Sequence, residues 1–329
     1  ICAASDGTVY MTTLYPFTLH AMKIPQMAGV TTVYRHNSHS DVILTRLLKT
    51  DTLDGKGQPS PLRLKSLYVD QIAKNDLSRP FAREHRVPIA DRIAKSLTDA
   101  DGQLNVDGVL LIAEHGSYDR SDTGQIIYPK RRMFAEIAKV FRETGKSVPV
   151  FNDKHLADNW QDAKWLYDTA RELDVPLMAG SSLPVLWRYP AADVRRGALL
   201  DEVVALSYGS LDAYGFHSLE MVQCLVERRR NGESGVASVQ CLTGDAVWSA
   251  KERGDLDGSL LQAALERLKR RPIPEGKSLE ELAPEPVLFI VDYRDGLRAS
   301  VLTPGTAVNE WSVAWRYAQD DPRQPGQIE

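Results

Sequence analysis

The first half of the chain alternates short β-branched apolar runs with amphipathic stretches of helical period. The apolar runs predict strands near residues 29–34, 62–69, 87–89, 109–113, 148–152 and 176–179. The amphipathic stretches predict helices near residues 42–49, 78–85, 91–97, 128–145 and 159–173. The run at 109–113 is apolar throughout, as in parallel strands that are buried on both faces. This alternation predicts a doubly wound parallel α/β sheet.

After about residue 185 the pattern changes. It predicts helices near 218–230 and 259–270, a strand near 236–242, and two strands joined through a hairpin at Arg294, Asp295 and Gly296. Residues 311–317 predict a further strand. We therefore expect an α+β domain with a mostly antiparallel open sheet. The predicted division is an N-terminal arm at 1–28, the α/β domain at 29–185, the α+β domain at 186–315 and a loose tail at 316–329.

Composition narrows the class of protein. The 329 residues are 43% hydrophobic and 26% charged, with a net charge of −4, which gives no electrostatic reason to expect nucleic acid or an anionic membrane as partner. No apolar run reaches the roughly 18 residues of a membrane span. Cys2, Cys224 and Cys241 fit no disulfide or zinc spacing, so we expect buried free thiols and a cytoplasmic protein. Residues 1–28 show no signal-peptide pattern, but the chain starts at Ile1, so export is not excluded.

The segment YRHNSHSD at 34–41 follows the first predicted strand. In nucleotide-binding α/β domains this turn carries glycines that let a pyrophosphate approach the backbone. Here side chains replace them, which predicts weak or absent dinucleotide binding. Arg35, Asn37 and Ser38 are the candidate phosphate contacts, because a guanidinium and helix N-terminal amides bind anions. Asp70 ends the second strand, where an acid would bind a ribose hydroxyl; an ordinary strand-end residue is the alternative.

Histidines collect at predicted strand ends and helix starts: His36, His39, His115, His155 and His217. Because the carboxyl ends of parallel strands share one edge, we expect the first four to lie close together. One hypothesis is acid–base chemistry. The other is a divalent metal held by His36, His39, His115 or His155 with Glu114 or Asp153, although no compact metal motif is present. His20 and His85 are expected to be structural or solvent-facing.

Three landmarks resemble the Gfo/Idh/MocA family of glucose–fructose oxidoreductases and inositol dehydrogenases over residues 29–310. Asp153-Lys154-His155 stands where family members carry Glu-Lys-Pro, Gly215-Phe216-His217 matches a Gly-x-His at a helix start, and DYRDGLRASVL matches a late strand pair. Two features depart from the family. The glycine-rich turn is absent, and the acid that precedes the Gly-x-His glycine is displaced to Asp212.

The resemblance implies a Rossmann-type domain, a second α+β domain, a site in the cleft between them, and NAD or NADP as cofactor. Lys154 would position the reacting hydroxyl or carbonyl, with His217 as acid–base partner and Asp212 as the displaced acid. Glu114 and His115 would contact a sugar, polyol or related substrate. The remaining expected cleft residues are Asp153, His155 and Trp187. The basic run 130–132 is expected to be a solvated helix face.

Two classes of function stay open. The first is an enzyme, either an oxidoreductase-like protein with a degenerate NAD(P) site or a non-redox lyase, hydrolase or isomerase that uses Lys154 and His217. The second is a catalytically silent ligand-binding protein. Retention of Lys154 and of 215–217 favours the enzyme. An open sheet face needs covering, so a homo-oligomer is expected.

Overall fold

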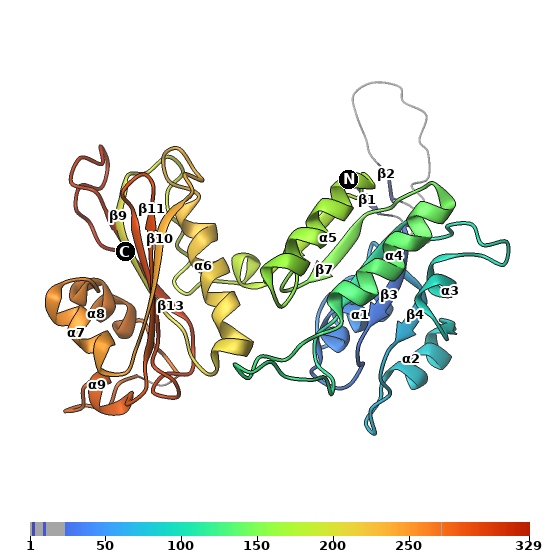
Figure 1. The fold of residues 1–329 in the computed structure, drawn as a ribbon, viewed down its shortest axis with the longest axis horizontal. Coiled ribbons are helices and arrows are strands. Elements are labelled where there is room, and N and C mark those ends of the chain that lie inside the picture. Colours follow the sequence, from blue (N-terminus) through green and yellow to red (C-terminus); the bar gives the residue numbers. More distant parts are fainter. Residues whose placement is uncertain (1, 4–8, 11–23, 271) are drawn as a thin grey trace. The chain divides into compact units, whose positions relative to one another are not determined.

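A computed structural model describes residues 2–3, 9–10, 24–270 and 272–329. The chain divides into two compact units, residues 1–180 (unit 1) and 181–329 (unit 2), each with its own sheet (Figure 1). The two-residue strands β1 (Cys2–Ala3) and β2 (Val9–Tyr10) pair antiparallel. His20 and most of the expected N-terminal arm lie outside the described residues.

Unit 1 contains a six-stranded sheet in which all neighbours are parallel, in the order β5-β4-β3-β6-β7-β8. The strands are β3 (Gln26–Thr31), β4 (Arg63–Val69), β5 (Ile89–Ala90), β6 (Gly108–Ile112), β7 (Val150–Asp153) and β8 (Leu177–Gly180). All five residues of β6 are buried, as the apolar run predicted. The predicted parallel sheet is confirmed.

Helices cover both faces of this sheet. They are α1 (His39–Leu48), α2 (Ser78–His85), α3 (Ile93–Leu97), α4 (Lys130–Thr144) and α5 (Trp160–Glu172). Leu44 of α1 and Phe81 of α2 pack into one apolar cluster, and α3, α4 and α5 contribute to the other. Helices on both faces make the sheet doubly wound, because parallel strands require crossovers that return over the sheet.

The first strand and helix are placed differently from the prediction. Strand β3 ends at Thr31 rather than at residue 34, and α1 begins at His39 rather than at residue 42. Val33 and Tyr34 extend the apolar run of the sequence and are buried, but they belong to the turn and not to the strand. The Tyr34 hydroxyl lies 2.7 Å from Thr45 Oγ1 of α1. Ser38 caps α1, because its side chain accepts a hydrogen bond from the backbone of the first helical turn. The strand-to-helix turn is therefore residues 32–38.

Unit 2 contains a mixed five-stranded sheet in the order β10-β11-β12-β9-β13, in which only β12 and β9 are parallel. The strands are β9 (Leu200–Leu206), β10 (Val236–Thr243), β11 (Val287–Tyr293), β12 (Arg298–Thr303) and β13 (Ser312–Tyr317). This confirms the mostly antiparallel sheet, although the sequence pattern did not single out β9. Figure 1 shows α6 on one face of this sheet and α7, α8 and α9 on the other.

The helices of unit 2 are α6 (Phe216–Val226), α7 (Asp245–Arg253), α8 (Gly258–Glu266) and α9 (Leu279–Leu282), with a 3₁₀ turn at Leu183–Val185 and a π-helical turn at Leu211–Gly215. Strand β10 lies at the sheet edge, and all its residues except Leu242 are exposed. The expectation of buried thiols is therefore wrong for Cys241, which is exposed on β10. No described helix is long and apolar enough to cross a membrane.

The C-terminal stretch, expected to be a loose tail, folds back on β13. The backbone N–H groups of Trp315 and Glu329 each donate to the other residue's carbonyl, at 2.8 and 3.0 Å. Asp321 is 2% exposed and accepts a hydrogen bond from Arg195 at 2.7 Å. Burial alone would raise the pKa of Asp321, but hydrogen bonds from three backbone amides and from Arg195 lower it to about 2. The proline and glycine residues of this stretch suggested a loose tail, but the backbone pairs with β13.

Candidate active site

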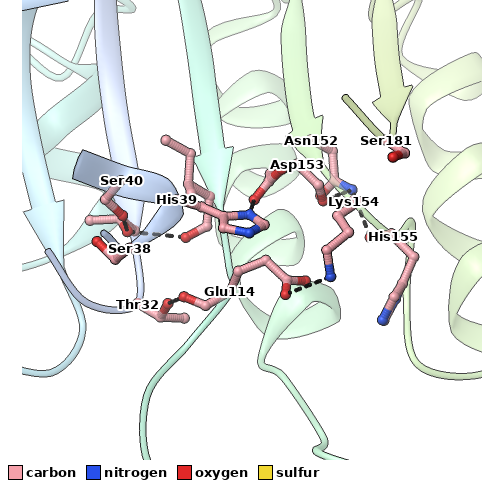
Figure 2. Close-up of polar contacts among 12 residues, drawn as sticks. Thr32, Ser38, His39, Ser40, Glu114, Asn152, Asp153, Lys154, His155 and Ser181 are labelled. Atoms are coloured by element: carbon pink, nitrogen blue, oxygen red, sulfur yellow. Dashed lines mark hydrogen bonds and ion pairs between the residues drawn. The ribbon is translucent and has the colours of Figure 1, made fainter. Parts of the chain in front are cut away.

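The carboxyl ends of β3, β6 and β7 meet where the strand order of unit 1 reverses direction. Ligands of open α/β sheets bind at such a switch point. His39 follows β3 at the start of α1, Glu114 follows β6, and Lys154 follows β7. Figure 2 shows these side chains beyond the strand ends, where His39 contacts Asp153 and Lys154 contacts Glu114. This is the edge on which the sequence predicted a site.

Glu114 joins two lysines in a buried charged cluster. Its carboxylate oxygens lie 2.9 Å from Lys130 Nζ and 3.1 Å from Lys154 Nζ. Lys130 also donates to the backbone carbonyls of Asp153 and Lys154, at 3.1 and 2.8 Å. Burial alone would raise the pKa of the Glu114 carboxyl, but the Lys130 and Lys154 ammoniums hold it below its usual range. The cluster therefore carries one negative and two positive charges in a nearly dry environment.

Lys130 was missed by the sequence reasoning. The run 130–132 was expected to be a solvated helix face, and this is wrong for Lys130, which is fully buried. Arg131 and Arg132 do lie at the surface, where they pair with Asp162 and Asp70. Lys130 lies three and four residues before the buried Met133 and Phe134, so the helical period places it on the same face. That spacing was the available signal.

His39 and Asp153 form a second polar pair. Nδ1 of His39 lies 2.5 Å from Oδ2 of Asp153, and the His39 side chain is 29% exposed. The His115 ring meets the His39 ring edge-on, with centroids 4.9 Å apart. Burial, followed by the neighbouring His39, lowers the pKa of His115 to about 4. A carboxylate on Nδ1 fixes the tautomer of His39 and leaves Nε2 to accept a proton.

His155 and Asp158 extend this edge in the loop after β7. His155 Nδ1 lies 4.0 Å from Asp158 Oδ1, and both side chains are largely buried. Burial, together with the nearby Lys130, lowers the pKa of His155, whereas burial raises the pKa of Asp158 to about 6. Titratable groups shifted in opposite directions are typical of functional sites. Asp158 was not among the residues singled out from the sequence, because it follows no predicted strand directly.

The turn at 32–38 is the place where the fold would hold a dinucleotide pyrophosphate. Several of its backbone N–H groups are bonded within the chain: that of Arg35 donates to Ser38 Oγ at 3.1 Å, and that of Ser38 donates to the Arg35 carbonyl at 2.9 Å. Asn37, at φ 58°, donates its N–H to the Asp41 carboxylate at 3.0 Å. Asp41 thus places a negative charge at the start of α1, where a phosphate would bind. In this arrangement the amides of Arg35, Asn37 and Ser38 are not available to a pyrophosphate.

Asp70, the candidate ribose ligand, is already engaged. Its carboxylate accepts hydrogen bonds from the Tyr68 hydroxyl at 2.8 Å, from Arg132 at 2.7 Å and from the Tyr118 hydroxyl at 2.9 Å. Burial alone would raise the pKa of Asp70, but these three donors hold it below its usual range. Three partners on one carboxylate leave little acceptor capacity for a ribose.

The four candidate metal ligands are not brought together. His39 and His115 are in contact, whereas the His36 side chain is 79% exposed and lies 3.5 Å from Asp41. Within the described parts of the chain, no three His, Cys, Asp or Glu side chains are grouped so as to hold a metal ion.

The candidates of unit 2 lie near the start of α6 and in the segment before β9. His217 Nδ1 forms a hydrogen bond with Ser181 Oγ, and its ring lies 5.8 Å from the Trp311 ring. Asp212 belongs to the π-helical turn before α6, and Trp187 is fully exposed. The pairing of His217 with Lys154 stays a prediction.

No protein-family model and no curated protein matches the sequence. Among solved structures, scyllo-inositol dehydrogenase from Lactobacillus casei, with bound NAD(H) and scyllo-inositol, is 10% identical with a TM-score of 0.51, over 93% of this chain and 76% of that one. GenD2 from gentamicin A biosynthesis, in complex with NAD, is 13% identical with a TM-score of 0.50, over 96% and 74%. This chain spans 60% of the length of a third match, from Bordetella bronchiseptica RB50, at 12% identity and a TM-score of 0.47.

At such low identity the likeness establishes the fold and leaves the chemistry to the residues of this chain. Both of the first two matches extend over both units. The chain has the two-domain fold of the Gfo/Idh/MocA-type dehydrogenases, as its sequence landmarks predicted.

Proposed function

We propose that this protein is an enzyme that carries out acid–base chemistry on a hydroxylated, carbonyl-bearing small molecule at the carboxyl edge of the unit 1 sheet. The observation that supports this most is the pair His39–Asp153 beside the buried Lys154–Glu114–Lys130 cluster. One set of groups moves a proton, and the other stabilises negative charge. Sugars and polyols oxidised to the carbonyl level are the substrate class that the fold and these groups favour together.

His39 is the proposed base. Asp153 accepts the Nδ1 proton, so Nε2 takes a proton from a carbon next to the substrate carbonyl. The resulting imidazolium faces the Asp153 carboxylate, which stabilises its positive charge. His115 stays neutral at physiological pH, because burial lowers its pKa to about 4. His115 therefore adds no competing positive charge beside His39.

Lys154 is the proposed electrostatic partner. As the proton leaves carbon, negative charge develops on the carbonyl oxygen, and an ammonium held in a low-dielectric site stabilises that charge by several kcal/mol, about 10²-fold or more in rate. Glu114 and Lys130 are positioning residues that fix the Lys154 side chain. The lysine is 5% exposed, so little rearrangement of water accompanies the step.

A nicotinamide oxidoreductase is the second candidate, because the two structures described above contain NAD or NAD(H). A bound dinucleotide would supply hydride transfer. The self-bonded turn at 32–38 and the three donors on Asp70 count against it. We therefore place the acid–base enzyme first and assign no step to a cofactor.

The test measures the exchange of carbon-bound protons with solvent, because this exchange can be followed without knowing the product of the reaction. The protein is incubated in D₂O with a panel of ketoses, aldoses and oxidised polyols, and loss of the proton next to the carbonyl is followed by proton NMR. We expect exchange with at least one compound, reduced about 10²-fold or more in His39→Gln. His36→Gln, in the same turn but exposed, is the matched control. Exchange at the wild-type rate in His39→Gln, or exchange that requires added NAD(P), would overturn the proposal.

A further inference from the structure

Unit 2 contains a cavity of about 870 Å³ that the acid–base site of unit 1 does not use. It lies between the segment before β9, the residues that follow α8, and the residues around the start of β13. Its volume is that of a typical small-molecule site. The residues that matter for its chemistry are Trp187, Tyr189, Trp311, Arg267, Lys269 and Arg270.

Aromatic side chains stand at the border of this cavity. Trp187 is fully exposed and Tyr189 is 85% exposed. Trp311 is held in place by Tyr208, with ring centroids 4.6 Å apart. Large aromatic rings left in water gain free energy when a flat, partly apolar surface covers them. The apolar face of a sugar-like ring is such a surface.

The carboxylates that line the cavity are already bonded. Asp193 pairs with Arg188 at 2.6 Å, and Glu329 accepts a hydrogen bond from Gln324 at 2.9 Å. Glu310 accepts hydrogen bonds from the backbone N–H groups of the segment that follows α8. Arg188 balances the charge of Asp193, whereas Glu310 and Glu329 keep their negative charges, because their amide donors are neutral.

The three basic side chains that follow α8 have no ion-pair partner among the described residues. Arg267, Lys269 and Arg270 line the cavity, and none of them forms an ion pair with another described residue. The lining has four basic and three acidic side chains, so it has a small excess of positive charge, and Arg267, Lys269 and Arg270 are the cations without an acidic partner among the described residues. Carboxylates and phosphates are the groups that such a surface recognises.

We propose that this cavity binds a hydroxylated ring compound that carries a carboxylate or a phosphate. The aromatic rings stack on the ring of the ligand, and the basic side chains bind its charged group. The inference rests on unit 2 alone, so it does not depend on the acid–base chemistry proposed for unit 1.

The experiment is isothermal titration calorimetry of the whole protein with four probes. Glucuronate and glucose 6-phosphate carry both features, glucose lacks the charge, and inorganic phosphate lacks the ring. We expect measurable binding of glucuronate or glucose 6-phosphate, at least about tenfold weaker binding of glucose and of phosphate, and an affinity that falls with added salt. The preferred charged probe distinguishes carboxylate from phosphate recognition.

Two variants assign the contacts. Trp187→Ala should weaken the binding of the charged probe about fivefold to tenfold, the range for one aromatic contact. The double variant Lys269→Gln/Arg270→Gln should weaken it about tenfold or more and remove the salt dependence. Trp160→Ala and Lys146→Gln, both exposed in unit 1, are the matched controls and should bind normally. Equal binding of glucose and glucuronate would overturn the charge assignment. If the wild type binds none of the four probes, the ligand site is overturned.

Discussion

Asp153 Oδ2 lies 2.5 Å from Nδ1 of His39, although 114 residues separate the two in the chain. The contact exists because β3 and β7 end at the same edge of the sheet, with β6 between them. The first residue of α1 then extends across the end of β6 to reach the last residue of β7. The parallel sheet thus brings together two distant segments, one with the imidazole and one with the carboxylate that orients it.

Asp153→Asn should reduce proton exchange on the substrate found by NMR about 10²-fold or more, because an amide no longer fixes the productive tautomer of His39. The unfolding midpoint should change little, since Asn has the same shape. Asp162→Asn, a surface carboxylate of α5, is the control. Equal exchange rates in Asp153→Asn and in the wild type would show that Asp153 does not orient the base.

Lys130→Met should destabilise unit 1 by about 3–5 kcal/mol, because it removes one partner of a buried ion pair and leaves the Glu114 carboxylate with Lys154 alone. Urea unfolding measures the change. Arg131→Met, whose side chain is 49% exposed, should cost less than about 1 kcal/mol.

A companion variant separates charge from packing. Lys130→Met combined with Glu114→Gln should recover part of the lost stability, because the uncompensated carboxylate is gone. If the double variant is less stable than Lys130→Met by the full cost of Glu114→Gln alone, the two residues are energetically independent and the ion pair is not the cause.

Calorimetric titration with NADH and NADPH should give dissociation constants of about 1 mM or weaker, because Asp41 and Ser38 already bond the amides of the turn. Asp41→Asn removes the negative charge at the start of α1 and should tighten binding of either dinucleotide severalfold. Low-micromolar binding to the wild type would instead favour the oxidoreductase.

His115 should remain neutral until the pH falls to about 4, as followed by ¹H–¹⁵N correlation spectra of the imidazole nitrogens. His115→Gln identifies its resonances. Since the folded pKa lies below the usual 6.5, the unfolded chain binds more protons between pH 6.5 and 4. This residue therefore destabilises the folded state as the pH falls through that window, and His115→Gln should lose less stability there.

Glu202 in unit 2 predicts the opposite pH dependence. Burial, together with the nearby Asp257, raises its pKa to about 7 from a usual value of 4.5. The folded state binds more protons between pH 4.5 and 7, so stability falls as the pH rises through that window. Glu202→Gln should stabilise the protein at pH 8, on the order of 1 kcal/mol, and have little effect at pH 4.5. Asp201→Asn, whose side chain is 60% exposed, is the control for urea unfolding at both values.

The parallel sheet was predictable because short β-branched runs and amphipathic stretches are local signals. The grouping of Glu114, Asp153 and Lys154 was predictable from topology, since strand ends share an edge. Strand β9 was missed because Asp201 and Glu202 interrupt its apolar run.

Other features depend on long-range contacts that no local pattern contains. The helical period places Lys130 on the buried face of α4, but the partner that balances its charge, Glu114, lies sixteen residues earlier, after β6. The hydrogen bond between Asn37 and Asp41 depends on the left-handed backbone conformation of Asn37. Asn tolerates this conformation, but its presence in a sequence does not predict it. The C-terminal stretch pairs with β13 through backbone hydrogen bonds, and the pattern of side chains along the sequence does not predict such bonds.

The self-bonded turn at 32–38 has a consequence for the amount of folded protein in a cell. A dinucleotide that binds only the folded state shifts the folding equilibrium by mass action, so the amount of such a protein follows the cofactor supply. Here Ser38 and Asp41 occupy the helix start from within the chain. If the turn binds no dinucleotide, as we propose, the folded fraction of unit 1 does not change with the concentration of nicotinamide cofactor.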